Sequence, residues 1–302
     1  MAQKEYGKLE AHIINTFIKS KRFECQGKEY IVEIADKPRP QGNGGECKTD
    51  VFILAKEKKT NNRREIKISV KNDNKEFIGN KLTKKDVESY FGPEWEDIVI
   101  KTTKSLKEEF ENRVLIFASG KHPTKENSVT VGWKLEISDR PRTLSAKIPL
   151  SDQEIRNYVY KGTNMSEDKK NSIVDNKIIK NSGVAEYLLI TNKDEIKTAN
   201  DVIDKMESID NANIGETYFI FTANNYRTDV DKADGKRSLA VRIEWHDKNN
   251  KMVPVYYYDK PLSFTGEGDM AQYVKEALSS LGKKNASELK PGIDVDKKIF
   301  ME

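Results

Sequence analysis

The clearest pattern in the chain is a pair of apolar, alternating segments between residues 50 and 71. The first opens at Asp50 with four apolar residues at 51–54, and a polar stretch at 58–63 ends it. The second, 64–71, places Ile66, Ile68 and Val70 on one face and charged or hydroxyl side chains on the other. This period of two is typical of a half-buried strand. The two segments together predict an antiparallel hairpin.

The open end of this hairpin brings two chemical groups together. A turn centred between Thr60 and Asn61 places Asp50 opposite Lys71. Facing residues in such a pair lie roughly 4.5 to 5.5 Å apart. We therefore expect a carboxylate and an ammonium group side by side at the end of the two strands.

The rest of the chain alternates between helical and strand patterns. Apolar residues at three- and four-residue spacing predict a helix over 4–21, with Glu10 at the edge of its apolar stripe. A capping box at Ser151 and Glu154 predicts a helix from there to residue 160. Further helices are expected at 82–91, 103–112, 199–206 and 270–281, and strands at 30–35, 114–118, 129–137, 187–191, 217–222, 238–245 and 252–258. This order predicts a mixed α/β (α+β) protein with a sheet-and-helix core in residues 1–140 and an α+β region in residues 141–302, either separate or continuous with the core.

Composition narrows the class of protein. The chain of 302 residues has 34% charged residues and a mean hydropathy of −0.76, yet its 36% hydrophobic residues follow clear strand and helix patterns. No apolar run approaches the roughly 18 residues that cross a membrane, and the N-terminal residues lack a signal-peptide core, so we expect a cytoplasmic protein without a membrane partner. Two cysteines are too few for a disulfide framework. A net charge of +4 permits a polyanionic partner.

The hairpin resembles the core of the PD-(D/E)XK nucleases, a superfamily that includes many type II restriction endonucleases. In that family an Asp at the head of one strand and a second acid hold a divalent cation beside the scissile phosphate, and a Lys at the end of the next strand assists the attacking water. The resemblance assigns these roles to Asp50 and Lys71. It also implies a restriction-endonuclease-like core with a mixed central sheet, in which a helix and the apolar strand 114–118 follow the hairpin.

One position departs from the family pattern. An acid normally stands two residues before the Lys, and here that residue is Ser69. Reading Glu65 and Lys67 as the acid–Lys pair would restore the pattern. Those residues, however, would face positions four to six residues along the strand from Asp50, or roughly 13 to 20 Å away at about 3.3 Å per residue. One metal ion cannot be shared over that distance, although a turn centred elsewhere would weaken this objection.

The alternative keeps Ser69 and Lys71, as in a subgroup of restriction endonucleases with Ser-x-Lys at this place. The missing acid would then come from Asp86 or Glu88 in the helix at 82–91. A Glu of the first helix often approaches the metal in nucleases of this class, which makes Glu10 a further candidate. Glu10 is equally well explained as a surface charge of its helix.

The resemblance implies a Mg²⁺-dependent endonuclease that hydrolyses phosphodiester bonds of double-stranded DNA, as a homodimeric type II restriction endonuclease. Asp50, with Asp86 or Glu88, would bind the cation. Lys71 would orient the nucleophile and stabilise the developing charge, while Ser69 would bond a metal-bound water. Two alternatives remain: a repair or phage nuclease with the same core and no sequence specificity, and a non-catalytic DNA-binding protein with a degenerate core.

The candidate DNA contacts lie in two places. Lys48 belongs to the glycine-rich stretch 42–49, which is not a phosphate-binding P-loop because Cys47 replaces the Gly before the Lys and a strand follows instead of a helix. In the second half, arginines and asparagines interleave with tyrosines, and Arg and Asn pair well with guanine and adenine edges. The candidates there are Asn224, Asn225, Arg227 and Arg242.

Overall fold

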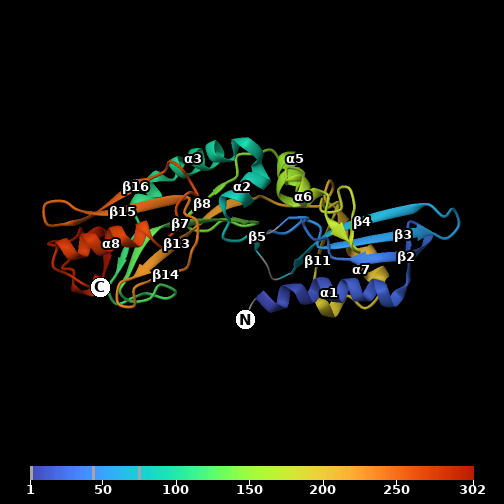
Figure 1. Cartoon of the computed structure of the whole chain (residues 1–302), viewed down its shortest axis with the longest axis horizontal. Helices are drawn as coiled ribbons and strands as arrows, with labels where there is room; N and C mark the ends of the chain where they lie inside the picture. The colour runs from blue at the N-terminus through green and yellow to red at the C-terminus, as the bar shows by residue number, and fades with distance from the viewer. Residues whose placement is uncertain (1–2, 43–44, 74–75) are drawn as a thin grey trace. The chain divides into compact units, whose positions relative to one another are not determined.

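The computed structural model describes residues 3–42, 45–73 and 76–302 and divides the chain into two compact units (Figure 1). The first unit comprises Met1–Glu76, Ser89–Gly92 and Leu150–Gly215, and the second comprises Phe77–Glu88, Pro93–Pro149 and Glu216–Glu302. The expected division at residue 140 is therefore wrong. The chain returns to the first unit after residue 149 because that unit takes two of its sheet strands from residues beyond 180.

The first unit is built on a six-stranded sheet in the order β1–β2–β3–β4–β11–β12. Its strands are β1 (Arg22–Cys25), β2 (Lys28–Asp36), β3 (Val51–Glu57), β4 (Arg63–Asn72), β11 (Tyr187–Thr191) and β12 (Glu207–Ser208). Only β4 and β11 pair in parallel among these strands, and the other pairs are antiparallel. The predicted mixed sheet is present, and the hairpin of 51–54 and 64–71 is its β3–β4 pair.

Helices α1 (Gln3–Ser20) and α7 (Ala199–Lys205) pack on one face of this sheet (Figure 1). The alternation of β3 and β4 explains this, because their odd-numbered and even-numbered apolar residues respectively point to that face. Val51, Ile53 and Ile68 are fully buried there against Ile13 and Phe17 of α1. Each fully buried side chain of this kind contributes about 1.5–3 kcal/mol. Burial of this face holds the start of β3 and the end of β4 in a fixed place.

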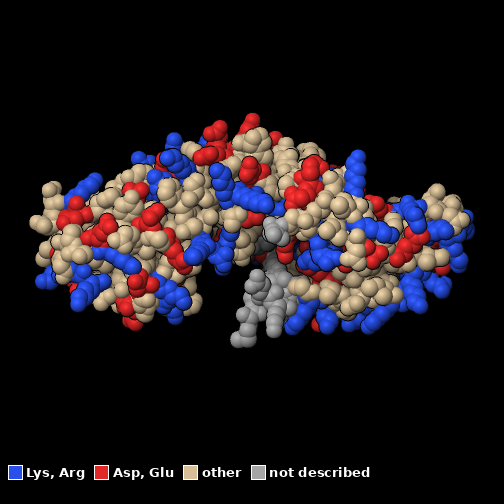
Figure 2. Space-filling view, in the orientation of Figure 1, with Lys and Arg blue, Asp and Glu red and all other residues tan. Residues whose placement is uncertain are grey.

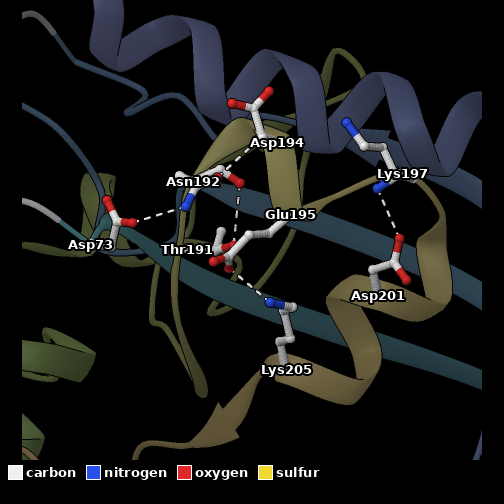
Figure 3. Close-up of polar contacts among 8 residues, drawn as sticks. All are labelled: Asp73, Thr191, Asn192, Asp194, Glu195, Lys197, Asp201 and Lys205. Atoms are coloured by element: carbon white, nitrogen blue, oxygen red, sulfur yellow. Dashed lines mark hydrogen bonds and ion pairs between the residues drawn. The ribbon is translucent and has the colours of Figure 1, made fainter.

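A polar network fastens the turn after β11 to the end of β4 (Figure 3). The Asn192 amide donates to Asp73 at 2.9 Å, just beyond β4. Glu195, in the 3₁₀ turn η3 (Lys193–Glu195), accepts from the Thr191 hydroxyl at 3.0 Å and from Lys205 of α7 at 2.7 Å. These bonds tie β11 and α7 together beside the end of β4.

The second unit contains a nine-stranded sheet with the path β14–β13–β7–β15–β16. These strands are β7 (Ser128–Ser138), β13 (Tyr218–Arg227), β14 (Lys232–Ala233), β15 (Val241–Asp247) and β16 (Met252–Tyr257), and β5 (Phe77–Gly79), β6 (Ile116–Phe117), β8 (Ser145–Lys147) and β17 (Phe300–Met301) pair off this path. Its helices are α2 (Lys84–Phe91), α3 (Trp95–Ser105), α4 (Lys107–Glu111) and α8 (Asp269–Ser280), with α2 ending in residues grouped with the first unit.

The apolar strand expected next in the nuclease core belongs elsewhere. Ile116 and Phe117 form β6, which pairs with β7 and β17 of the second unit. The strand that pairs with β4 in the first unit is β11, about 70 positions later in the chain. The prediction that 114–118 continues the core sheet is wrong, because a short apolar run carries no information about its partner strand.

Most other predicted elements are confirmed. The helix expected at 103–112 is instead divided at Leu106 into α3 and α4. The capping box at Ser151 and Glu154 is present, but α5 (Asp152–Ile155) continues as a π-helical turn, Arg156–Lys161. The remaining short elements are α6 (Glu167–Lys170), β9 (Ile173–Val174), β10 (Lys177–Ile178) and the 3₁₀ turns Gly92–Glu94, Ala286–Glu288 and Lys297–Ile299. The predicted mixed α+β class is confirmed. No helix in the described ranges is long and apolar enough to span a membrane.

Candidate functional site

The β3–β4 hairpin has a register two positions different from the expected one. Val51 pairs with Ile68, and the backbone N–H of Asp50 donates to the carbonyl oxygen of Ile68 at 2.8 Å. Continued by one residue, this register places Asp50 beside Ser69, with Lys71 two residues further along β4. The prediction that Asp50 faces Lys71 is wrong because Asn61, with a φ of 61°, lets the turn close one residue earlier than an evenly centred turn would.

Asp50 is held in place by β4. Its carboxylate oxygen Oδ2 accepts from the backbone N–H of Val70 at 2.7 Å and from the Ser69 hydroxyl at 3.4 Å. Burial raises the pKa of Asp50, and the positive charge of Lys71 is the strongest influence that lowers it. The ammonium group of Lys71 is thus close enough to act on the Asp50 carboxylate, although the two residues are not directly opposite. Because side chains alternate along a strand, Ser69 and Lys71 share one face of β4.

Glu10 reaches the same place from the first helix. Leu9 and Ile13 anchor α1 in the core, which places Glu10 at the edge of the helix, partly buried. Burial raises the pKa of Glu10, and the negative charge of Asp50 raises it further. The Glu10 carboxylate also accepts a hydrogen bond from the ammonium group of Lys37. The structure therefore brings the first-helix candidate close to Asp50.

Asp86 and Glu88 are not part of this cluster in the first unit. Both residues are grouped with the second unit. The Asp86 carboxylate caps its own helix, since it accepts from the backbone N–H of Thr83 at 2.9 Å and from the Thr83 hydroxyl at 2.7 Å. Glu10, in the same unit as Asp50, is the candidate acid whose pKa the Asp50 charge raises.

In the alternative pair, the partner of Glu65 lies four positions along the chain from Asp50 and the partner of Lys67 lies two positions from it. Glu65 is exposed and pairs with Leu54, while Lys67 pairs with Phe52. The Lys67 side chain is buried, and its Nζ lies 2.8 Å from a carboxylate oxygen of Glu186. Lys67 therefore has a structural ion pair of its own, and the geometry favours Ser69 and Lys71 as the β4 side of the site.

The carboxylate oxygens of Asp50 and Glu10 are suitable ligands for a hard divalent cation. Asp50 and Glu10 offer oxygen ligands, and Mg²⁺ takes one or two protein carboxylates together with water and phosphate oxygens. No group of three His, Cys, Asp or Glu side chains in the described part of the chain is arranged to hold an ion by itself. The two carboxylates could hold such a cation if water and substrate oxygens completed its coordination.

The segment that leads into Asp50 is fixed by backbone bonds. The N–H groups of Lys48 and Thr49 both donate to the carbonyl oxygen of Gly183, at 3.0 and 3.1 Å. The Lys48 ammonium lies 4.0 Å from the centroid of the Tyr90 ring, a cation–π contact. Residues 43 and 44 of the glycine-rich stretch lie outside the described residues. As expected, a strand and not a helix follows this stretch, which excludes a P-loop.

Three of the four predicted DNA contacts in the second half are buried. Asn224 is fully buried on β13, and Asn225 bonds to Thr130 at 2.9 Å and to Asp234 at 3.3 Å. Arg242 donates to Asp259 at 3.1 Å. Its guanidinium group also lies over the rings of Tyr257 and Phe264 and 3.4 Å from Glu244. Their proposed role as direct base contacts is wrong for this conformation, because burial removes these side chains from any ligand surface. Arg227 is only partly buried and stays a candidate.

Two residues of the site were missed by sequence reasoning. Lys37 follows β2 directly, and its positive charge acts on Glu10, Glu46 and Asp50. Glu46 lies exposed in the segment before β3. Charged residues in a loop carry no pattern that would have singled them out. Over the visible face, Lys and Arg are interspersed with Asp and Glu (Figure 2), so the distribution of charge on this face does not point to the site either.

Comparison of the chain with family models, curated proteins and solved structures yields no match.

Proposed function

We propose that this protein is a Mg²⁺-dependent endonuclease that hydrolyses phosphodiester bonds of double-stranded DNA. The observation that carries the proposal is the cluster in the first unit that joins Asp50, Ser69 and Lys71 of the hairpin with Glu10 of α1. These are the groups expected of a Ser-x-Lys variant of the PD-(D/E)XK core, with the acid missing from β4 supplied by the first helix.

Asp50 and Glu10 are the residues that would hold the cation. When bound there, Mg²⁺ lowers the pKa of a coordinated water and withdraws charge from the phosphate. The N–H of Val70 and the hydroxyl of Ser69 both donate to Oδ2 of Asp50 and so orient its carboxylate. Fixing an acid in this way reduces the conformational cost of binding.

Lys71 supplies a positive charge beside the same carboxylate. A phosphate bridging to the cation at Asp50 would lie within reach of this ammonium group, which would balance the negative charge that develops on the non-bridging oxygens. Lys71 also opposes the effect of burial on Asp50, because its charge lowers the pKa that burial raises and so favours the ionised form. The same side chain thus supports both cation binding and phosphate binding.

The experiment is cleavage of supercoiled plasmid DNA with Mg²⁺ by the intact protein and by Asp50→Asn. We expect nicked and linear DNA from the intact protein and none from the variant, with DNA binding in Ca²⁺ retained by both. Asp204→Asn, which changes an exposed Asp of α7, is the matched control and should cleave normally. Full activity of Asp50→Asn would show that the site is misplaced, and the absence of any Mg²⁺-dependent cleavage would favour a non-catalytic DNA-binding protein.

The finer proposal is a type II restriction endonuclease that acts as a homodimer on a palindromic site. Two symmetry-related centres would cut the two strands of such a site. Digestion of phage DNA to discrete fragments, together with a dimer mass in solution, is the expected result. A smear of products would favour the repair or phage nuclease without sequence specificity.

A further inference from the structure

Lys37 lies among the acids of the proposed cation site. Its ammonium group donates to the Glu10 carboxylate, and its charge acts on Glu46 and Asp50 as well. Lys37 is the first residue after β2, and its own backbone N–H is held by Asp36 Oδ1 at 2.8 Å. The flexible Lys37 side chain can change its position without breaking this backbone bond.

The local charges explain why a Lys is needed here. Glu10, Glu46 and Asp50 bring three negative charges to one region, and Lys37 and Lys71 bring two positive charges. The negative charge of Asp50 acts on Glu10, and both acids are partly buried. Like charges in such surroundings destabilise each other unless a cation lies nearby.

We propose that Lys37 is a built-in counter-ion of the metal-free site, which occupies the place of the divalent cation beside Glu10 and must leave that place when the metal binds. This inference rests on the proposed nuclease function. A cation at Glu10 and Asp50 would repel the ammonium group, and the Lys37 side chain has a route to solvent because 38% of it is exposed, against 15% of Glu10. Lys37 therefore competes with the divalent cation and keeps its affinity low in the absence of DNA.

A purely structural ion pair would behave differently. If Lys37 only held α1 to the end of β2, its removal would loosen Glu10 and weaken cation binding. If Lys37 is the competitor, its removal leaves the acids without a partner, so the metal-free protein loses thermal stability while its affinity for a divalent cation rises. A saturating cation should then restore the lost stability by mass action.

The test is isothermal titration of the full chain with Mn²⁺ alone, without DNA. Lys37→Met and Lys37→Gln are compared with the intact protein and with Lys28→Met. Lys28 lies at the other end of β2 and has a comparable ion pair, 3.1 Å from Glu57, which makes it the matched control. We expect both Lys37 variants to bind Mn²⁺ about tenfold more tightly, within the usual range for coupled sites, and Lys28→Met to bind as the intact protein does.

Unchanged or weaker Mn²⁺ binding by both Lys37 variants would overturn the inference. Lys37→Gln can still donate to Glu10 without carrying a charge, which guards against a failure of Lys37→Met to fold. Asp50→Asn separates this result from the proposed function, because it should abolish Mn²⁺ binding. If Asp50→Asn bound Mn²⁺ normally, or if the intact protein and both Lys37 variants bound none, the cation site itself would be wrong.

Discussion

The hydroxyl of Ser69 on β4 donates to the carboxylate of Asp50, the residue just before β3, at 3.4 Å. In the PD-(D/E)XK pattern an acid stands at the position of Ser69. The Ser69 hydroxyl carries no negative charge. It can orient the Asp50 carboxylate, but it cannot replace a second carboxylate as a ligand of a cation. Glu10 of α1, whose pKa is raised by burial and by Asp50, is the acid that the first unit places nearby. The proposed cation site is therefore divided between the hairpin and the first helix.

The first prediction compares two lysines of β4. Lys71→Met should lower the cleavage rate by two or more orders of magnitude, because it removes the positive charge beside Asp50, and electrostatic groups of this kind contribute about 10²–10³ in kcat. Lys67→Met should retain most of its activity per folded molecule, since Lys67 is bonded to Glu186 instead. Single-turnover cleavage of a plasmid measures both rates.

The opposite ranking of these two variants would restore Glu65 and Lys67 as the reacting pair. Circular dichroism of each variant serves as the control, because Lys67 is buried and its replacement can affect folding as well as chemistry.

A second prediction concerns the pH dependence of cleavage. The pKa values of Asp50 and Glu10 are both raised, chiefly by burial, above their ordinary values of 3.8 and 4.5. A protonated carboxyl group cannot hold Mg²⁺, so the rate should fall with decreasing pH at a higher pH than for ordinary carboxyl groups. Since a bound cation favours the ionised form, raising the Mg²⁺ concentration should move this fall to lower pH. A rate that stays constant down to pH 4.5 at low Mg²⁺ would contradict this account.

The third prediction is that Asp50→Asn stabilises the metal-free protein at neutral pH. A raised pKa means that the folded state binds the proton more tightly than the unfolded state does, so stability falls as the pH rises from 3.8 through the raised value. Asn removes this cost and still accepts from Val70. The expected gain in Tm at pH 8 is a few degrees, since about 1 kcal/mol corresponds to about 2–4 °C in a protein of this size.

Calorimetry without metal, at pH 8 and at pH 5, measures this gain. The difference between Asp50→Asn and the intact protein should shrink at the lower pH, where more of Asp50 is protonated. A loss of stability in the variant at pH 8 would mean that the attraction of Lys71 outweighs burial.

A fourth prediction follows from the parallel pairing of β4 with β11. A fragment of residues 1–140 should not fold, because it lacks β11 and α7, which bury Leu189, Ile196 and Val202 in the core of the first unit. Each lost side chain removes about 1.5–3 kcal/mol, and β4 would be left with an unpaired edge. Loss of the cooperative thermal transition, followed by circular dichroism, is the expected result. A folded fragment would contradict the described unit boundaries.

The fifth prediction separates two arginines of the second unit. Arg242→Met should destabilise the protein by about 3 kcal/mol, because it leaves Glu244 and Asp259 without a buried partner. Arg227→Ala should change stability little and weaken DNA binding. The slope of the logarithm of the binding constant against the logarithm of the salt concentration should become smaller by about one, as for the loss of one phosphate contact. Urea denaturation and salt-dependent binding to a DNA duplex measure the two effects. Normal stability of Arg242→Met would reopen its assignment as a DNA contact.

Local pattern was enough to find the elements on which the site is built. The alternation of 64–71 identified β4, and the helical spacing of 4–21 identified α1 with Glu10 at its edge. Asp50 and Lys71 were found at the ends of their strands, and the resemblance to the PD-(D/E)XK core made them and Ser69 site candidates. The register was wrong because the centre of a polar turn depends on backbone conformation, here a positive φ at Asn61, which composition does not define.

The local sequence pattern could not predict which segments far apart in the chain pair or pack together. Nothing in residues 187–191 distinguishes a strand that pairs with β4 from one that pairs with β7, and the buried state of Asn224 and Arg242 depends on neighbours far along the chain. The sequence by itself determined the α+β class, the hairpin and the acids and lysines available for chemistry. Only the tertiary structure decided which of them meet, because helix and strand periods arise from local geometry whereas charge proximity arises from packing of segments distant in the chain.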